Sequence, residues 1–252
     1  WSQELHGRLS QQSVPEILQS DVSDLVREAA IWGAQMHELA LIDQPIPAQL
    51  AQAQEKLSKL NVIADTKRIT DFGKQVHALG GSANIAIMLL KSQRLSLAHQ
   101  SLACALAGLL ESKDPLMQSQ TVEVMPRLVF LQKNKQHAIW QLIKQWHRKI
   151  NMQLLDWPLH DLGIILAFGF PQWIAKHNRD GRFSLANGSG AVLNIEDELL
   201  LHLSQSKNKQ SWLAIGNMQL TDTQSDSAVI RYAEPIPFSA LEEHFDSFFS
   251  SK

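Results

Sequence analysis

The first third of the chain carries apolar residues at the spacing of amphipathic helices. Between residues 22 and 32 they recur every three or four positions, and Gly33 then offers a natural stop. Pro47 suits the first turn of a second helix, because its missing N–H would have no partner there. We therefore expect two helices at the start, the second with an apolar face that reaches Leu60.

Residues 61–70 interrupt this helical spacing. They hold two short β-prone pieces around a polar tip, which predicts a small hairpin. The hydroxyl of Thr70 can then accept a hydrogen bond from the first turn of a third helix, with Phe72 and Val76 on its apolar side. Helix, helix, small hairpin and helix together predict a winged-helix domain over residues 17–80.

Residues 82–155 return to helical spacing and predict a helical bundle over residues 81–157. One of its helices contains a run of small residues, which would let a second helix approach closely: Ala103, Ala105, Ala107 and Gly108. We interpret this run as a packing feature rather than a functional one.

The pattern changes beyond Pro158. Four short segments have the composition of strands: residues 183–186, 190–193, 212–218 and 228–232. Asn187-Gly188 joins the first two and can supply the positive φ angles of a tight hairpin, and the polar residues 221–226 join the last two. We expect these strands to close into a small antiparallel OB-like barrel over residues 158–238.

A last helix is expected within residues 239–252. Ser239 can cap it, and its apolar side would carry Phe245, Phe248 and Phe249. The predicted fold class is therefore mainly α with a small β part (α+β), in several domains: winged helix, helical bundle, small barrel and C-terminal helix.

Composition narrows the class of protein. Hydrophobic residues make up 44% and charged residues 19%, as in globular proteins, and a net charge of -2 provides no overall basic field for nucleic acid. Cys104 is the single cysteine, so an intrachain disulfide is excluded, and a reducing cytoplasm is expected. The longest apolar run, residues 162–170, is too short to span a membrane.

Motifs for catalysis are missing from the sequence. Gly73-Lys74 is the only Gly-Lys pair, and Gln75 follows it where a phosphate loop needs Ser or Thr. His37-Glu38 begins like a zinc-protease helix, but Leu41 occupies the place of the second histidine. We therefore predict no catalytic residue, no metal site and no cofactor within this chain.

A basic stretch from Pro126 to Ile150 is the most informative local feature, because it contains six cations, three aromatic residues and no acid. Lys144 and Arg148 fall on one face of the expected helix, where they could bind phosphates, while an exposed ring could stack a base. Alternatively, the tryptophans belong to the core and the cations only keep the surface soluble.

A second basic cluster, residues 176–182, precedes the Asn187-Gly188 turn of the expected barrel. Its cations are Lys176, Arg179 and Arg182. Loops and strand faces of OB barrels bind single strands, so this cluster is a second candidate contact. A purely solubilising role is the competing interpretation.

Several ordered motifs resemble the region that follows the two motor domains of bacterial HrpB-type DEAH-box helicases. Among them are Ala30-Ile31-Trp32-Gly33, Ile69-Thr70-Asp71-Phe72-Gly73, Leu109-Leu110-Glu111-Ser112-Lys113-Asp114-Pro115, Leu166-Ala167-Phe168-Gly169-Phe170-Pro171 and Arg182-Phe183-Ser184-Leu185-Ala186-Asn187-Gly188. The resemblance covers nearly the whole chain. It departs from the family at residues 80–84, where a Pro-Arg type sequence is usual, and it is weakest at residues 116–155.

The resemblance implies that residues 1–16 are the tail of an upstream motor domain, and that ATP and Mg²⁺ bind to motor domains outside this chain. It implies a nucleic-acid helicase whose accessory segment, inactive alone, guides a single strand, RNA rather than DNA. The implied contacts are Lys176, Arg179, Arg182, Lys144 and Arg148. The alternative is a protein-interaction scaffold that binds a partner through the winged helix or the last helix and touches no nucleic acid.

Overall fold

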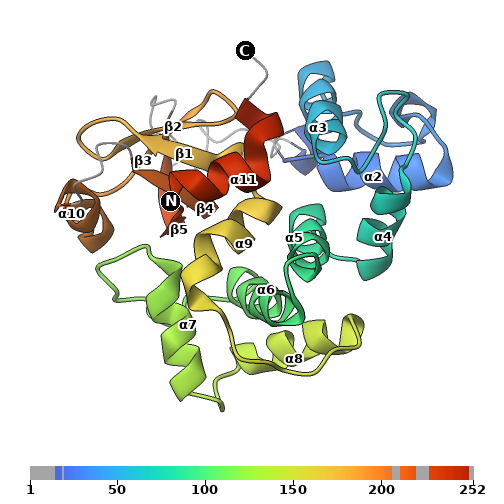
Figure 1. Ribbon diagram of the computed structural model, residues 1–252. Coiled ribbons are helices and arrows are strands. Elements are labelled where there is room, and N and C mark those ends of the chain that lie inside the picture. The colour runs from blue at the N-terminus through green and yellow to red at the C-terminus, as the bar shows by residue number, and fades with distance from the viewer. Residues whose placement is uncertain (1–14, 19, 206–210, 220–226, 250–252) are drawn as a thin grey trace, which may run out of the picture. The chain divides into compact units, whose positions relative to one another are not determined.

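The computed structural model describes residues 15–18, 20–205, 211–219 and 227–249. The chain divides into two compact units, Trp1–Ala83 and Asn84–Lys252, which are described separately. The model combines helices with one closed barrel, so the α+β class is confirmed (Figure 1). The finer domain limits and the expected motor-domain tail, which falls mostly outside the described residues, remain predictions.

Within its described residues, the first unit contains three α-helices, α2 (Ser23–Trp32), α3 (Pro47–Lys59) and α4 (Asp71–Leu79), and two short 3₁₀ turns, η1 (Glu16–Leu18) and η2 (Met36–Glu38). Both α3 and α4 pack against α2. Apolar side chains from all three helices and the intervening segment form the core of this unit: Val26, Ala53, Leu57, Val62, Ile63 and Val76.

Two predicted helix boundaries are confirmed in this unit. Gly33 ends α2 in the left-handed conformation with φ 73°, and the following N–H of Ala34 donates to the Ala29 carbonyl at 3.0 Å. The Thr70 hydroxyl accepts a hydrogen bond from the Gly73 N–H at 2.8 Å, which caps α4 as expected.

The predicted hairpin at residues 61–70 is shorter than expected, because its strands reduce to a single antiparallel bridge between Ile63 and Ile69. A four-residue turn closes it, in which the Lys67 N–H donates to the Ala64 carbonyl at 2.7 Å. Thr70 directly precedes α4, so few residues remain for pairing.

The second unit begins with helices α5 (Ala83–Gln93), α6 (Leu97–Leu110), α7 (Val124–Lys133) and α8 (Ile139–Lys149). Every residue of α6 from Gln100 to Leu109 is buried. A Cβ on Gly108 would lie 2.7 Å from Ile143 Cγ1 on α8, so the close approach predicted from the small residues occurs here.

Helix α9 (Leu162–Gly169) lies between α6 and the barrel, flanked by the 3₁₀ turns η3 (Leu159–Asp161) and η4 (Pro171–Trp173) (Figure 1). Two glycines let α9 approach its neighbours closely, one at the barrel and the other at α5. A Cβ on Gly163 would lie 2.2 Å from the Pro235 carbonyl oxygen, and one on Gly169 would lie 2.9 Å from that of Asn84. Bundle and barrel therefore form one compact unit.

The barrel has five strands, β1 (Ile174–His177), β2 (Arg182–Leu185), β3 (Gly190–Val192), β4 (Trp212–Gln219) and β5 (Ser227–Pro235), closed in the order β1-β2-β3-β5-β4. The four predicted strands are present, whereas β1 and helix α10 (Glu198–Gln205) were not predicted. The expectation of a purely antiparallel barrel is wrong, because β3 and β5 are parallel. An odd number of strands cannot alternate in direction around a closed ring.

The turn between β2 and β3 also differs from the predicted one. Of its two central residues only Gly188 has a positive φ, 87°, so the turn is not a two-residue hairpin with both angles positive. Instead, Leu185 N–H donates to the Ser189 carbonyl at 3.0 Å across a three-residue loop. The turn predicted at residues 221–226 lies outside the described residues.

The last helix, α11 (Phe238–Phe249), already contains Ser239 as its second residue, so Ser239 does not cap it and the predicted cap is wrong. Phe245 is buried, with its ring 5.5 Å from that of Phe168 on α9. The side chains of Phe248 and Phe249 lie outside the description. Among the described helices, none is long and apolar enough to cross a bilayer.

Candidate nucleic-acid interface

Strands β1 and β2 present a polar face outside the barrel. Side chains alternate along a strand, so Phe183 and Leu185 enter the barrel core while Arg182 and Ser184 are exposed. On β1, Ala175 is in the core and Lys176 faces the other way. Alternation therefore places Lys176 and Arg182, two of the predicted cations, on the same outer face.

The strand register arranges these residues in rows across the sheet. Lys176 pairs with Ser184 on one side and with Trp212 on the other, and Ser184 pairs with Gly190. Asn178 lies opposite Arg182, to whose carbonyl its N–H donates at 2.9 Å, and its Nδ2 donates to Ser184 Oγ at 2.8 Å. The row of Lys176 thus crosses four strands, from Trp212 on β4 to Gly190 on β3, and its polar side chains lie on β1 and β2.

The loop between β1 and β2 completes the basic cluster. Arg179 and Arg182 line one open pocket together with Asn178 and Asp180. The Arg182 N–H donates to the Arg179 carbonyl at 2.9 Å, and Asp180 has a positive φ of 51°, so the loop is a tight turn. The structure therefore brings Arg179 and Arg182 together as predicted from sequence proximity, with Asp180 as an acid among them.

Two aromatic rings border the same face, and the sequence analysis did not select them. The rings of Trp212 and Phe238 stack with centroids 6.0 Å apart at 27°, and Lys176 Nζ lies 5.7 Å from the Trp212 centroid. Phe238 is 50% exposed. The only sequence signal was an aromatic residue at the start of β4 and another after Pro235-Ile236-Pro237, and neither signal indicates that the two rings meet.

The basic stretch around α8 has a different character. Lys144 and Arg148 are exposed as predicted, but Trp140 and Trp146 are each only 3% exposed. Their indole N–H groups donate to the Leu131 carbonyl at 2.9 Å and to Glu111 Oε2 at 2.8 Å. These tryptophans belong to the core, as the alternative interpretation held, and they offer no free ring for a base.

Other cations of this stretch are engaged within the unit. Lys135 Nζ lies 4.2 Å from the Trp140 ring centroid, and Lys149 Nζ lies 4.4 Å from that of Trp146. Arg127 is buried, and its guanidinium contacts both carboxylate oxygens of Asp114 at 2.7 to 3.1 Å. Arg127 therefore forms an internal ion pair and does not face a ligand.

The two predicted basic sites are not brought together. The second unit is layered in the order α8, α6, α9 and barrel, so Lys144 and Arg148 lie at the opposite end from Lys176 and Arg182 (Figure 1). One extended strand would be needed to touch both. They are therefore two separate surfaces.

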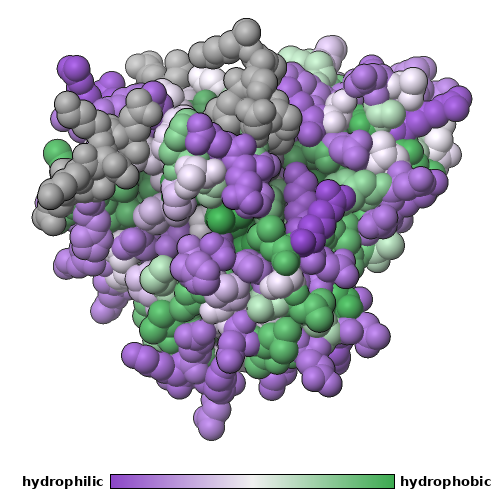
Figure 2. All heavy atoms as spheres, in the orientation of Figure 1, coloured by the Kyte–Doolittle hydropathy of each residue, from purple (hydrophilic) through white to green (hydrophobic). Residues whose placement is uncertain are grey.

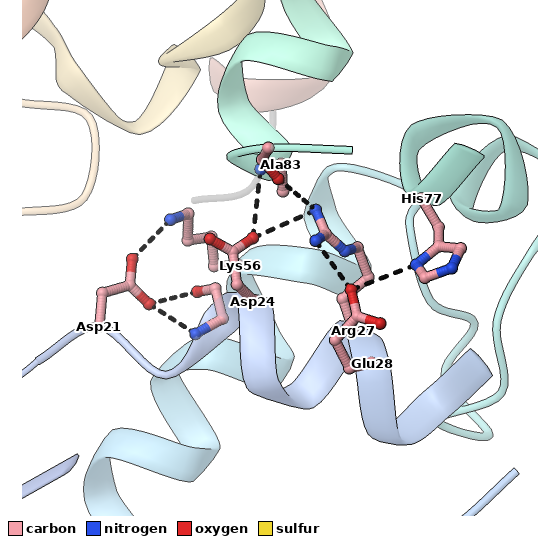
Figure 3. Close-up of polar contacts among 9 residues, drawn as sticks. Asp21, Asp24, Arg27, Glu28, Lys56, His77 and Ala83 are labelled. Carbon is pink, nitrogen blue, oxygen red and sulfur yellow. Dashed lines mark hydrogen bonds and ion pairs between the residues drawn. The ribbon is translucent and has the colours of Figure 1, made fainter. Parts of the chain in front are cut away.

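A charged network in the first unit has a structural explanation. Arg27 is 4% exposed and contacts Asp24, Glu28 and the Gly81 carbonyl at 3.0 to 3.2 Å, as Figure 3 shows. Asp24 also accepts the Ala83 N–H at 3.2 Å. The network therefore ties the chain after α4 to α2, and we assign it no ligand.

Metal and thiol chemistry find no support in the part of the chain that the structure describes. There, no three histidine, cysteine or acidic side chains come together as metal ligands. Burial raises the pKa of the Cys104 thiol to about 12, so it is not a reactive thiolate at neutral pH.

Comparison with known proteins identifies a relative, although no protein-family model matches. The protein named "ATP-dependent RNA helicase HrpB" of Escherichia coli (strain K12) is 30% identical over 197 residues, which cover 77% of this chain and 23% of that protein. The crystal structure of the E. coli DExH-box NTPase HrpB matches 98% of this chain with a TM-score of 0.78 at 27% identity, and the match covers 28% of that structure's chain.

A second crystal structure, of Escherichia coli DEAH/RHA helicase HrpB, matches 94% of the chain with a TM-score of 0.75 at 25% identity. The chain thus spans about a quarter of the length of the relatives that it matches. The resemblance seen in the sequence motifs is confirmed: the chain is homologous to the DEAH-box helicase HrpB and matches a C-terminal region of it.

Proposed function

We propose that this chain is the accessory segment of an ATP-dependent DEAH-box helicase and that it holds single-stranded nucleic acid on the outer face of its barrel. The observation that supports this most is that Lys176 lies beside the Trp212–Phe238 stack and on the same outer face as Arg182, with Arg179 in the adjoining loop. Cations bind phosphates by releasing counterions, and a half-exposed ring such as that of Phe238 can stack a base without regard to sequence, so the two together suit a single strand.

The topology supports an OB fold as the finer assignment of the barrel. OB folds are five-stranded Greek-key barrels that bind oligonucleotides through the face of strands 2 and 3 and through the loop between strands 1 and 2. In this chain Arg179 lies in that loop and Arg182 and Ser184 lie on β2. For the first unit, the order helix, helix, bridged turn, helix supports the winged-helix assignment.

The homology supports a proposal for the substrate and the motor. Because the curated relative is named an RNA helicase, RNA is the strand that we propose. ATP and Mg²⁺ would bind motor domains outside this chain, and a cytoplasmic location would fit such a protein. The proposed role of the present chain is therefore to bind the single strand while the motor domains move along it.

The test is a titration of the chain with fluorescently labelled single-stranded RNA and DNA at several salt concentrations. Replacing Lys176, Arg179 and Arg182 with alanine should weaken binding and reduce the slope of log affinity against log salt by up to about 0.7 for each phosphate that is no longer bound. The matched control replaces three exposed lysines elsewhere, Lys67, Lys113 and Lys133, and should leave the slope closer to that of the unmodified chain.

The scaffold alternative predicts a different outcome. A chain that only binds proteins would show no salt-sensitive affinity for either strand, and that result would refute the proposal. An unchanged salt slope in the barrel variant, with binding intact, would instead refute the assignment of the contact to the barrel face.

A further inference from the structure

A groove along α8 is the most distinctive surface that the proposed function does not use. It measures about 780 Å³ and is lined by Trp140, Gln141, Ile143, Lys144, Gln145, His147, Arg148 and Leu154. Its apolar lining comes from the helix and from the chain that follows it, where Leu154 is 48% exposed. Figure 2 shows apolar and hydrophilic surface side by side over the helices at the bottom of the view, where Figure 1 places α7 and α8.

The wall of the groove that follows α8 is fixed by buried polar contacts. Ser101 Oγ lies 3.0 Å from His147 Nε2, and it also contacts both backbone groups of Leu155 at 3.1 Å. The Met152 N–H donates to the His147 carbonyl at 2.9 Å. The segment that carries Leu154 is therefore held against α8, and the groove is preformed.

The charge of the groove has one sign. Lys144 and Arg148 are exposed on the face of α8 that lines it, and the chain contains no aspartate or glutamate from Val124 to Leu155. An exposed leucine beside two cations complements a ligand that carries aliphatic side chains between carboxylates.

Nucleic acid fits this groove less well than a peptide does. Trp140 and Trp146 are buried, and their ring faces are taken by Lys135 and Lys149, so these rings offer no stacking platform. Leu154 presents an aliphatic surface, which favours burial against another apolar side chain over contact with a phosphate backbone.

We propose that the α8 groove is a docking site for an acidic, leucine-bearing peptide segment of a partner protein. Its aliphatic side chains would pack on Leu154, and its carboxylates would pair with Lys144 and Arg148. This function is independent of strand binding at the barrel, which lies at the other end of the unit.

The probe is a synthetic peptide of about 14 residues with leucines every three or four positions and glutamates between them, the spacing of a helix that binds in a groove. Binding is followed by fluorescence anisotropy of the labelled peptide, and amide chemical shifts of the chain report where it docks. One matched peptide carries lysine in place of glutamate, another carries serine in place of leucine, and labelled oligouridine is the nucleic-acid arm.

The expected result is saturable binding of the Glu-Leu peptide, with shifts confined to α8 and residues 152–155, and much weaker binding of both matched peptides. The double variant Lys144→Glu, Arg148→Glu should lose at least about tenfold in affinity, because like charges then face each other. Leu154→Ser should also weaken binding, whereas Lys113→Glu, Lys133→Glu should not. All these side chains are exposed, so the fold should be unaffected, as circular dichroism would check.

Three outcomes would overturn the proposal. They are no saturable binding of the Glu-Leu peptide, equal binding of the lysine peptide, and displacement of the peptide by oligouridine with Lys144 and Arg148 as the shared contacts. The last outcome would mean that these two cations contact nucleic acid and not a peptide. Barrel variants should leave peptide binding unchanged, so failure here is distinguishable from failure of the proposed strand site.

Discussion

Replacing Glu234 with glutamine should remove a pH dependence from the stability of the second unit. Glu234 is 4% exposed on β5, and its Oε2 accepts the N–H groups of Val124 and Met125, each at 3.1 Å. Burial, together with the nearby Glu123 carboxylate, raises its pKa from 4.5 to about 7, and the two backbone hydrogen bonds oppose that rise. A buried acid therefore caps the start of α7.

The sign and size of the effect follow from linkage. Between pH 4.5 and about 7 the folded chain keeps a proton on Glu234 that the unfolded chain releases, so stability falls as pH rises through this window and levels off above it. Each pKa unit corresponds to about 1.4 kcal/mol, so the full loss is about 3 kcal/mol by pH 8. A neutral glutamine can still accept both N–H groups but has no proton to lose.

The assay is urea denaturation of both proteins at pH 5, 6, 7 and 8, followed by tryptophan fluorescence, since five of the seven tryptophans lie in the second unit. The free energy of unfolding of Glu234→Gln, relative to the unmodified chain, should rise by about 2.5 kcal/mol from pH 5 to pH 8, because a small part of the loss already occurs below pH 5. Parallel pH profiles for the two proteins would refute the argument, because they would mean that Glu234 titrates alike in the folded and unfolded chain.

Three further substitutions test single contacts. Gly73→Ala would place a Cβ 2.1 Å from the Val62 carbonyl oxygen and should destabilise the first unit by about 2 to 4 kcal/mol, seen as faster amide hydrogen exchange. Arg127→Met would leave the Asp114 carboxylate unpaired and should cost about 3 kcal/mol in urea denaturation. Gly188→Ala forces alanine to a φ of 87° and should lower stability by about 1 kcal/mol; unmodified stability in any of the three would contradict the corresponding contact.

Features governed by neighbouring residues were predictable from the sequence. Gly33 and Thr70 end and begin helices because their backbone and side-chain preferences act within one helical turn. The missing phosphate loop, the exposed Lys144 and Arg148, and four of the five strands also follow from local spacing. The cluster of Arg179 and Arg182 was predictable for the same reason, since a tight turn joins them.

Contacts between distant residues could be decided only by the tertiary structure. Whether a tryptophan in a basic stretch binds a base or fills the core depends on what packs against it, and for Trp146 that includes Glu111. Strand β1 turns a four-stranded sheet into a five-stranded ring and thereby requires one parallel pair. The sequence alone determined most helices, most strands and the absence of an ATP motif, because periodicity and capping are local. Packing across the chain decided which cations and rings share a surface, because burial depends on every element at once.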